Sequence, residues 1–486
     1  MKRLNMNKPC RFVIRRFAAA SLVASAVLLG GCVSTGATSP EQAAEASFSM
    51  PAYQAFQLAN GLTVNLMPQK EVPLITVNAV VRAGAVNDTT SGLANMTAKG
   101  LMLGAAGKSK AEIEQLVDFL GASLSAGAGK EGTYISADFM AKDVDTMLPL
   151  IRDVMLKPSF EQAELAKLKQ RQIAGLAQAK ESPRAVIGRY FDSLAYGQHP
   201  YGQPTSGTAQ SLAKVDASLL RAFHGSFYQP QNTALNIVGD FDIPAMKAKL
   251  TSLFGPWQAT QDVPQIDLAN NLPNYSQSKV LLVDKGDAIE TTFLIGGKGV
   301  RRDNADFVGL TVVNTILGGR FTSWLNDELR VNAGLTYGAR SGFVSYSHGG
   351  VFRMSTFTKA ETTKEAMDLA LKTYARLWEQ GVDASTLESA KSYVKGQFPP
   401  KYETSGQLAG LLGDMYLYGF NESFINDFQA KVDGLTVAES QRLIAKYFPQ
   451  QNLQYVLIGN ASKIEALAAD YGEVTKVDIK DVGFAQ

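Results

Sequence analysis

The stretch Thr233-Ala-Leu-Asn-Ile-Val-Gly239 has a counterpart near the other end of the chain, Leu453-Gln-Tyr-Val-Leu-Ile-Gly459. Both are short apolar runs that end in glycine, a pattern typical of buried strands. A helix pattern follows each of them, beginning near Pro244 and Lys463. The repetition indicates that the chain contains an internal duplication.

Each half of the chain also opens with two predicted strands, at residues 62–66 and 75–81 in the first half and 280–283 and 291–295 in the second. Amphipathic patterns between the opening and closing strands predict helices at 144–156, 162–180, 363–380 and 386–395. Groups of strands that flank groups of helices are typical of the α+β class. We therefore expect two α+β domains, each a sheet covered by helices.

The boundaries of these domains follow from composition. Residues 258–278 contain Pro264 and Pro273, several Asn and Gln, and little periodicity, which indicates a linker. It separates a predicted N-terminal domain, residues 50–257, from a predicted C-terminal domain, residues 279–486.

The N-terminus differs in kind from the rest of the chain. Six basic and no acidic residues precede an apolar run from Phe17 to Leu29, which ends in Leu29-Gly30-Gly31-Cys32. This end resembles a lipobox, so we predict a lipoprotein signal peptide at 1–31 and lipidation of Cys32. A short buried helix is the alternative, which the basic flank disfavours. Residues 32–49, rich in Ser, Thr and Ala, are predicted to form a flexible tether.

Processing also changes the charge of the protein. The full chain has a formal net charge of +2, but removal of residues 1–31 leaves 41 basic against 45 acidic side chains, a net of −4. A mildly acidic chain without a basic patch excludes typical nucleic-acid binding. Cys10 leaves with the signal peptide, so no intrachain disulfide is expected. Because Val33 rather than aspartate follows Cys32, we expect anchoring to the outer membrane, facing the periplasm.

Several motifs in the first half occur together. Arg82-Ala-Gly-Ala-Val-Asn-Asp88 precedes Ser91-Gly-Leu-Ala-Asn95, and His199-Pro-Tyr-Gly-Gln-Pro204 precedes Tyr228-Gln-Pro-Gln-Asn-Thr-Ala-Leu-Asn-Ile-Val-Gly-Asp240. With these motifs and the order of its elements, the mature chain resembles the pitrilysin (insulinase) family of zinc metallopeptidases. The resemblance implies mainly antiparallel sheets in both domains and a zinc-binding helix that opens at the second of these motifs.

Active members of that family carry a His-x-x-Glu-His motif. The histidines, at i and i+4, bind one zinc ion from the same helical face, and the glutamate is the general base. Aligned through Gly92-Leu93-Ala94, these three positions are Asn95, Ala98 and Lys99 here. An amide, a methyl group and an ammonium group cannot replace the motif, so we expect no metal in this chain.

No other residues restore the zinc site in the sequence. The family's third ligand would fall at Ala174 or Gly175, and neither carries a ligand atom. The histidines of the chain, His199, His224 and His348, lack the spacing of a metal site. We expect a capping or loop role for His199 and solvated positions for the other two.

The second half keeps more of the family pattern. Asn314-Thr-Ile-Leu-Gly-Gly-Arg-Phe-Thr-Ser323, Leu325-Asn-Asp-Glu-Leu-Arg330 and Gly334-Leu-Thr-Tyr-Gly338 resemble the family's glycine loop, helix and following strand. In that pattern an arginine and a tyrosine reach into the catalytic chamber, and here they would be Arg330 and Tyr337. The resemblance assigns the arginine to a substrate carbonyl and the tyrosine to the developing oxyanion.

Local patterns bear on this assignment. Trp324, Leu325 and Leu329 form an apolar helix stripe, and Gly334 is a plausible left-handed end to that helix. From spacing alone, a simpler interpretation is a surface ion pair of Arg330 with Glu328 or Asp327, and a half-buried strand position for Tyr337.

Gly318 and Gly319 are also predicted substrate-binding residues. They lack the phosphate-loop pattern and lie between two helical segments rather than after a strand. We expect them to allow close backbone approach to a substrate or to the neighbouring half of the chain.

These features predict a non-catalytic subunit of a heterodimeric zinc peptidase. A zinc-bearing partner of the same family would hold the metal, and this chain would supply Arg330 and Tyr337 in trans to bind peptide substrates. The mitochondrial processing peptidase implies such a division between subunits. The alternative is a membrane-tethered peptide-binding or assembly scaffold without peptidase activity. A peptidase active by itself would need a zinc site that the sequence does not contain.

Overall fold

The computed structural model describes residues 48–270 and 272–484. The predicted signal peptide, Cys10, Cys32 and most of the predicted tether lie outside the described residues. At the tether's end, the ring of Phe48 stacks on Tyr402 with centroids 5.9 Å apart and meets the edge of Phe398 at 5.9 Å. The packed part of the chain therefore includes Phe48.

The first sheet of the structure belongs to the N-terminal half, and its spatial order is β1-β2-β8-β3-β7-β6. Its strands are β1 (Gln54–Gln57), β2 (Thr63–Pro68), β3 (Leu74–Val81), β6 (Ser123–Ala128), β7 (Thr133–Met140) and β8 (Thr233–Gly239). Only the β2–β8 pair is parallel within this sheet. A separate two-stranded ribbon consists of β4 (Gly104–Ala105) and β5 (Lys108–Ser109).

The second sheet belongs to the C-terminal half and has the order β11-β12-β10-β13-β9-β14, which matches the first sheet read in reverse except that its edge strand β14 is parallel to β9. Its strands are β9 (Lys279–Asp284), β10 (Glu290–Lys298), β11 (Arg340–Ser345), β12 (Gly350–Lys359), β13 (Gln454–Gly459) and β14 (Glu473–Asp478). Its closing strand β13 pairs in parallel with the opening strand β9, as β8 pairs with β2 in the first sheet. The predicted α+β class with mainly antiparallel sheets is confirmed.

Helices surround both sheets. Those of the first half are α1 (Leu93–Gly100), α2 (Lys110–Phe119), α3 (Val144–Leu156), α4 (Gln162–Ala179), α5 (Pro183–Tyr196), α6 (Ala209–Lys214), α7 (Ala217–Phe227) and α8 (Ile243–Phe254). Those of the second half are α9 (Phe307–Asn314), α10 (Trp324–Asn326), α11 (Thr363–Glu379), α12 (Ala384–Gly396), α13 (Ser405–Tyr418), α14 (Ser423–Asn426), α15 (Phe428–Asp433), α16 (Val437–Tyr447) and α17 (Ala461–Ala468). The strands and helices that periodicity predicted are present at their places, but the strand expected at residues 334–338 from the family resemblance is not, since β11 begins at Arg340.

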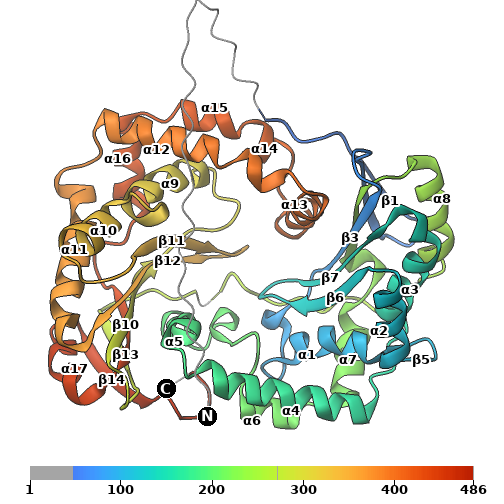
Figure 1. Ribbon diagram of the computed structural model, residues 1–486, viewed down its shortest axis with the longest axis horizontal. Helices are drawn as coiled ribbons and strands as arrows, with labels where there is room; N and C mark the ends of the chain where they lie inside the picture. The colour runs from blue at the N-terminus through green and yellow to red at the C-terminus, as the bar shows by residue number, and fades with distance from the viewer. Residues whose placement is uncertain (1–47, 271, 485–486) are drawn as a thin grey trace, which may run out of the picture. The chain divides into compact units, whose positions relative to one another are not determined.

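The two halves exchange one helix each. Helix α13 of the second half packs on β3 and β8 of the first sheet, and helix α5 of the first half packs on β10 and β13 of the second (Figure 1). Close approach requires glycine in both contacts: a Cβ at Gly413 of α13 would lie 2.9 Å from Val80, and one at Gly296 of β10 would lie 2.7 Å from Phe191 of α5. Each sheet is therefore covered on one face by its own half and on the other by its neighbour.

A row of buried asparagines lies under α13. Asn65 donates to Asn236 Oδ1 at 2.8 Å, Asn236 donates to the Asn78 carbonyl at 2.9 Å, and Asn78 Nδ2 donates to the Ala409 carbonyl of α13 at 3.3 Å. The register pairs these residues across β2, β8 and β3. In the second sheet the corresponding positions are the apolar residues Leu281, Val456 and Leu294, which pack with α5. The polar row thus distinguishes the two helix-docking faces.

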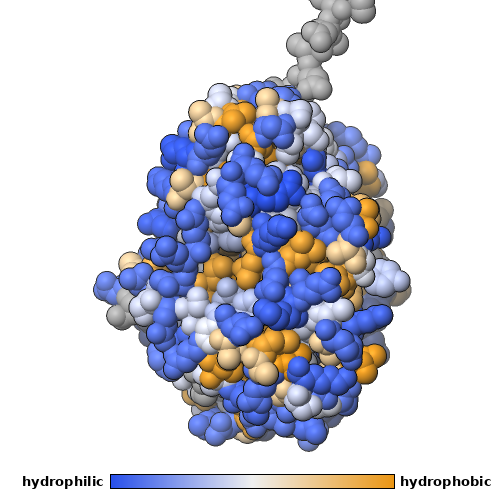
Figure 2. Space-filling model, turned by 90° about the vertical axis from the view of Figure 1, so that its left-hand side faces the viewer, coloured by the Kyte–Doolittle hydropathy of each residue, from blue (hydrophilic) through white to orange (hydrophobic). Residues whose placement is uncertain are grey.

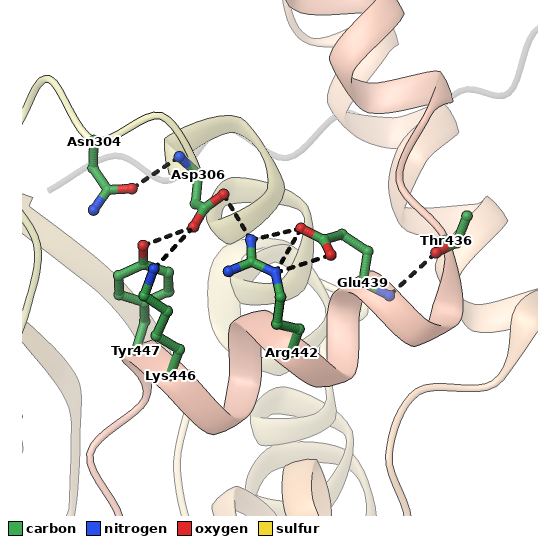
Figure 3. A network of polar contacts seen from close by, with 7 residues as sticks. All are labelled: Asn304, Asp306, Thr436, Glu439, Arg442, Lys446 and Tyr447. Atoms are coloured by element: carbon green, nitrogen blue, oxygen red, sulfur yellow. Dashed lines mark hydrogen bonds and ion pairs between the residues drawn. The ribbon is translucent and has the colours of Figure 1, made fainter.

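A polar network fixes the start of α9, the helix that leads into the glycine loop (Figure 3). The carboxylate of Asp306 accepts hydrogen bonds from Arg442 at 2.8 Å and from the Tyr447 hydroxyl at 2.7 Å, both on α16. Arg442 is held in turn by Glu439, one helical turn earlier. The entrance to the glycine loop is therefore braced against α16.

The surface of the second half is mixed in character. Figure 2 views the side on which α11 and α17 lie and shows a hydrophilic surface interrupted by patches of hydrophobic side chains. Among residues 48–270 and 272–484, no helix combines the length and the apolar character needed to cross a membrane.

Candidate functional site

The glycine loop of the second half is a turn of π-helix. This turn, Thr315–Gly319, continues directly from α9. A Cβ at Gly318 would collide with the backbone nitrogen of Ser341 on β11, whereas Gly319 is exposed. Asn314 and Ser341 hydrogen-bond to each other at the same contact, Ser341 Oγ donating to Asn314 Oδ1 at 2.7 Å. The close approach that Gly318 allows is therefore to a strand of its own half.

Arg330 lies in a second π-helical turn, Asp327–Asn332, and its guanidinium stands 4.3 Å from the ring centre of Phe321. The ion pair with Glu328 expected from spacing does not form. Glu328 instead pairs with Arg376 at 3.1 Å and accepts a hydrogen bond from Asn332 at 3.2 Å. Within the described part of the chain, no carboxylate lies within ion-pairing distance of Arg330.

Tyr337 lies on the segment that joins this turn to β11. Its side chain is 84% exposed, so the half-buried strand position expected from spacing is wrong. The residues on either side are held in place, because Thr356 of β12 donates to the carbonyl of Gly338 at 2.9 Å and contacts the Thr336 hydroxyl at 2.9 Å. The exposed side chain of Tyr337 therefore lies on a segment whose flanking residues are hydrogen-bonded to β12.

The chain reversal before Tyr337 follows the prediction. Gly334 has φ of +64°, the left-handed conformation that favours glycine, and it follows Ala333, the C-cap of the helical turn. The predicted apolar stripe is also confirmed, since Leu325 and Leu329 are buried. Phe321 and Val331, each 68% exposed, add apolar surface next to Arg330. Arg330 thus lies beside exposed apolar side chains.

The degenerate zinc positions of the first half lie on α1. Asn95 and Ala98 are buried, and Lys99 is half-buried. The ammonium group of Lys99 donates to Gln172 Oε1 on α4 at 2.7 Å, and burial lowers the pKa of Lys99. Gln172 is therefore the α4 residue that meets these positions, in place of the predicted Ala174 and Gly175.

The start of α1 is held by a buried carboxylate. Asp88 accepts hydrogen bonds from the backbone N–H groups of Gly92 and Ala94, each at 2.7 Å. Burial raises the pKa of Asp88 to about 7, although these hydrogen bonds act in the opposite direction. The predicted acidic turn before this helix is confirmed as its N-terminal anchor.

The histidines take structural positions. His199 caps a short 3₁₀ turn, its Nδ1 accepting from the Tyr201 N–H at 3.1 Å, as expected. The solvated position expected for His224 is wrong: its Nε2 lies 2.7 Å from the Met155 carbonyl, and burial lowers its pKa. His348 lies in the turn between β11 and β12. In the described ranges, no three His, Cys, Asp or Glu side chains are grouped to hold a metal ion.

Comparison with known families identifies this arrangement. Residues 65–209 match the insulinase family (peptidase family M16), and residues 214–394 match the M16 inactive domain. The chain belongs to the M16 peptidase family. The first of these matches covers the degenerate zinc positions of this M16 chain, and the second covers Arg330 and Tyr337.

The M16 relatives carry names of both kinds, peptidase and non-peptidase. The uncharacterized zinc protease YmxG of Bacillus subtilis is 23% identical over 348 residues, 71% of this chain and 83% of the relative. The non-peptidase homolog YmxG of Helicobacter pylori is 24% identical over 428 residues, 83% of this chain and 96% of the relative. A crystal structure of an M16 inactive domain from Pseudomonas fluorescens aligns with a TM-score of 0.79 at 26% identity, covering 84% of this chain and 98% of that one.

M16 zinc does not fit the residues of α1. Lys99 places a cation where a dication would bind, and Ala98 has no atom that could act as a base. The nearest side chain on α4, Gln172, is an amide already bonded to Lys99. The side chains at these positions of α1 therefore do not supply the ligands and base of the family's zinc motif.

Proposed function

We propose that this chain is the non-catalytic subunit of a two-chain M16 zinc peptidase, lending Arg330 and Tyr337 to a zinc-bearing partner. The observation that carries the proposal is that Tyr337 is 84% exposed on a braced segment, while Arg330 has no ion-pair partner in the described ranges. Groups that stabilise a fold are normally paired or packed, so these two are available to bind something else.

The chemistry of the two groups suits an extended peptide. The guanidinium of Arg330 can donate to a peptide carbonyl, and the Tyr337 hydroxyl can donate to the oxyanion that forms as that carbonyl is attacked. A positioned donor of this kind is worth ~2.7–4 kcal/mol in catalysis. That contribution cannot replace a metal, but it makes a second subunit necessary for full turnover.

We also propose that the chain acts at the outer membrane, anchored through Cys32 and facing the periplasm. The basic N-terminus, the apolar run and the Leu-Gly-Gly-Cys sequence support this placement. Labelling with a palmitate analogue tests it: wild type should incorporate the label, and Cys32→Ser should not.

The test of the subunit role is purification of the tagged protein from its native host, followed by mass spectrometry and a chelator-sensitive peptidase assay. Recovery of a chain with a His-x-x-Glu-His motif in near-equal amount, with activity only in the mixture, supports the proposal. An inactive, zinc-free protein recovered alone would favour the scaffold function instead. Zinc and activity in the single chain would overturn both.

Variants of the reconstituted complex then test the two residues. Tyr337→Phe and Arg330→Met should each lower turnover by roughly one hundredfold or more. Arg376→Met is the matched control, because Arg376 also lies over an aromatic ring, that of Trp324 at 4.4 Å, but is engaged with Glu328. Unchanged turnover in Tyr337→Phe would count against the catalytic role.

A further inference from the structure

The place of the absent zinc site is a cavity of about 390 Å³ between α1, α4 and α5. We call it the Lys99 cavity. Its charged and amide-bearing lining residues are Asn95, Lys99, Lys130, Gln172, Arg189 and Asp192. Three of these side chains are cationic and one is anionic, so the lining carries a net positive charge.

One of the three cations is fully engaged within the protein. The ammonium group of Lys130 donates to the carbonyls of Tyr201 and Gln203 at 2.5 and 2.7 Å and lies 3.5 Å from the carboxylate of Asp192. These three partners match the three N–H donors of a lysine. Asp192, the carboxylate in the lining, is therefore committed to Lys130.

The other two cations lack a counter-charge. Nη1 of Arg189 is buried and has no hydrogen-bond partner among the described residues, and its guanidinium stands 5.3 Å from the ring centre of Phe484. Lys99 donates to the neutral amide of Gln172. Within residues 48–270 and 272–484, neither side chain forms an ion pair.

A half-buried cation without a counter-charge is partly desolvated at a cost, and two such cations line this one cavity. The cost is visible in both groups, because burial lowers the pKa of Lys99 and of Arg189. An anion placed between them would offset it through charge-assisted hydrogen bonds, and the forked guanidinium matches the paired oxygens of a carboxylate or phosphate.

We propose that the Lys99 cavity is an oxyanion-binding site, in which Lys99 and Arg189 hold the oxygens of a carboxylate or phosphate group. Asn95 and Gln172 supply neutral amides beside them. The position that binds a metal cation in active relatives has thereby become a site for an anion. This inference concerns the single chain and does not depend on a zinc-bearing partner.

Calorimetric titration of the purified full-length chain, without a partner, tests the site with three probes. They are acetyl-trialanine with a free carboxylate, its C-terminal amide, and inorganic phosphate. Binding of the free acid but not the amide identifies a peptide carboxylate as the ligand, and binding of phosphate alone identifies phosphate. Either result supports the oxyanion site when Lys99→Met and Arg189→Met each weaken binding about tenfold or more.

The control is Lys167→Met, which removes one positive charge from α4 where the lysine pairs at the surface with Glu164. It should leave the affinity unchanged. The proposal is overturned if neither the free acid nor phosphate binds, or if both cavity variants bind as wild type does. Circular dichroism shows whether each variant is folded. If Arg189→Met does not fold, the affinity of Lys99→Met alone tests the proposal.

Discussion

Arg376 Nη1 lies 3.1 Å from Oε1 of Glu328, two residues before Arg330. Residues two apart on a helical turn do not face each other, so Glu328 and Arg330 point to different neighbours. Glu328, the carboxylate nearest to Arg330 in the sequence, is thus paired with Arg376. Arg330 is left without an ion pair because of how the chain folds.

This relationship predicts different stabilities for two matched variants. Arg376→Met breaks a half-buried ion pair and a contact with Trp324, so it should lower the free energy of unfolding by about 1 kcal/mol. Arg330→Met removes no ion pair and should change it less. Denaturant unfolding of the single chain measures both, and an equal loss in Arg330→Met would show that Arg330 has a structural role.

The exchanged helix α13 offers a second matched pair. Gly413→Ala places a methyl group 2.9 Å from Val80 and should destabilise the protein by roughly 1–3 kcal/mol through overpacking. Gly410→Ala, on the same helix, meets no atom within 4 Å and should stabilise it by up to ~1 kcal/mol through helix propensity. Thermal unfolding compares them, and effects of the same sign would contradict the close packing of α13 on the first sheet.

Glu131 joins the two halves by a different route. It accepts hydrogen bonds from the Tyr201 hydroxyl at 2.7 Å and from the N–H of Ser347, in the turn between β11 and β12, at 3.0 Å. Glu131→Ala leaves these buried donors unpaired, so we expect a loss of ~1–3 kcal/mol and faster amide exchange in residues 346–349. Glu114→Ala, at an exposed ion pair, should change neither quantity. Unchanged exchange in Glu131→Ala would mean that water replaces the carboxylate without cost.

Asp88 gives the stability a pH dependence. Its pKa in the folded chain, about 7, lies above the ordinary value of 3.8, so its contribution to stability is fully present below the ordinary pKa and is lost as the pH rises through about 7. Wild type should therefore lose stability relative to Asp88→Asn between pH 4 and pH 7, by ~1.4 kcal/mol for each unit of pKa displacement. Urea unfolding at several pH values measures this difference, and a constant difference would mean that Asp88 titrates normally.

Much of the fold could be predicted because its buried strands and amphipathic helices carry clear periodicities. Some of the elements without a predicted range lack such periodicities. Helix α13 contains three glycines and packs between the two halves. Its polar face is therefore narrow, and its sequence shows little amphipathic periodicity. The edge strands β6 and β11 are rich in Ser and Gly. This composition is typical of loops, so the sequence alone does not predict strands there.

In the candidate site, too, some features could be predicted from the sequence and others could not. The position of Gly334 was predictable because a left-handed helix end favours one residue type. The contact between Lys99 and Gln172 was not, because it depends on which side of α4 faces α1 and not on a count of residues before Pro183. The Lys99 cavity also draws on the β6–β7 hairpin and on α5, which no motif connects to the zinc positions.

The exchange of α5 and α13 limits when each half of the chain can complete its packing during synthesis. The first sheet is complete in sequence at Gly239, yet the helix that covers β3 and β8 is not made until residues 405–418. A nascent chain that has reached the linker therefore exposes Val80, Asn78 and Asn236 to water, or to whatever chaperone attends it. We therefore expect each half to complete its packing only when the other is present, and two fragments cut at the linker to fold better together than alone.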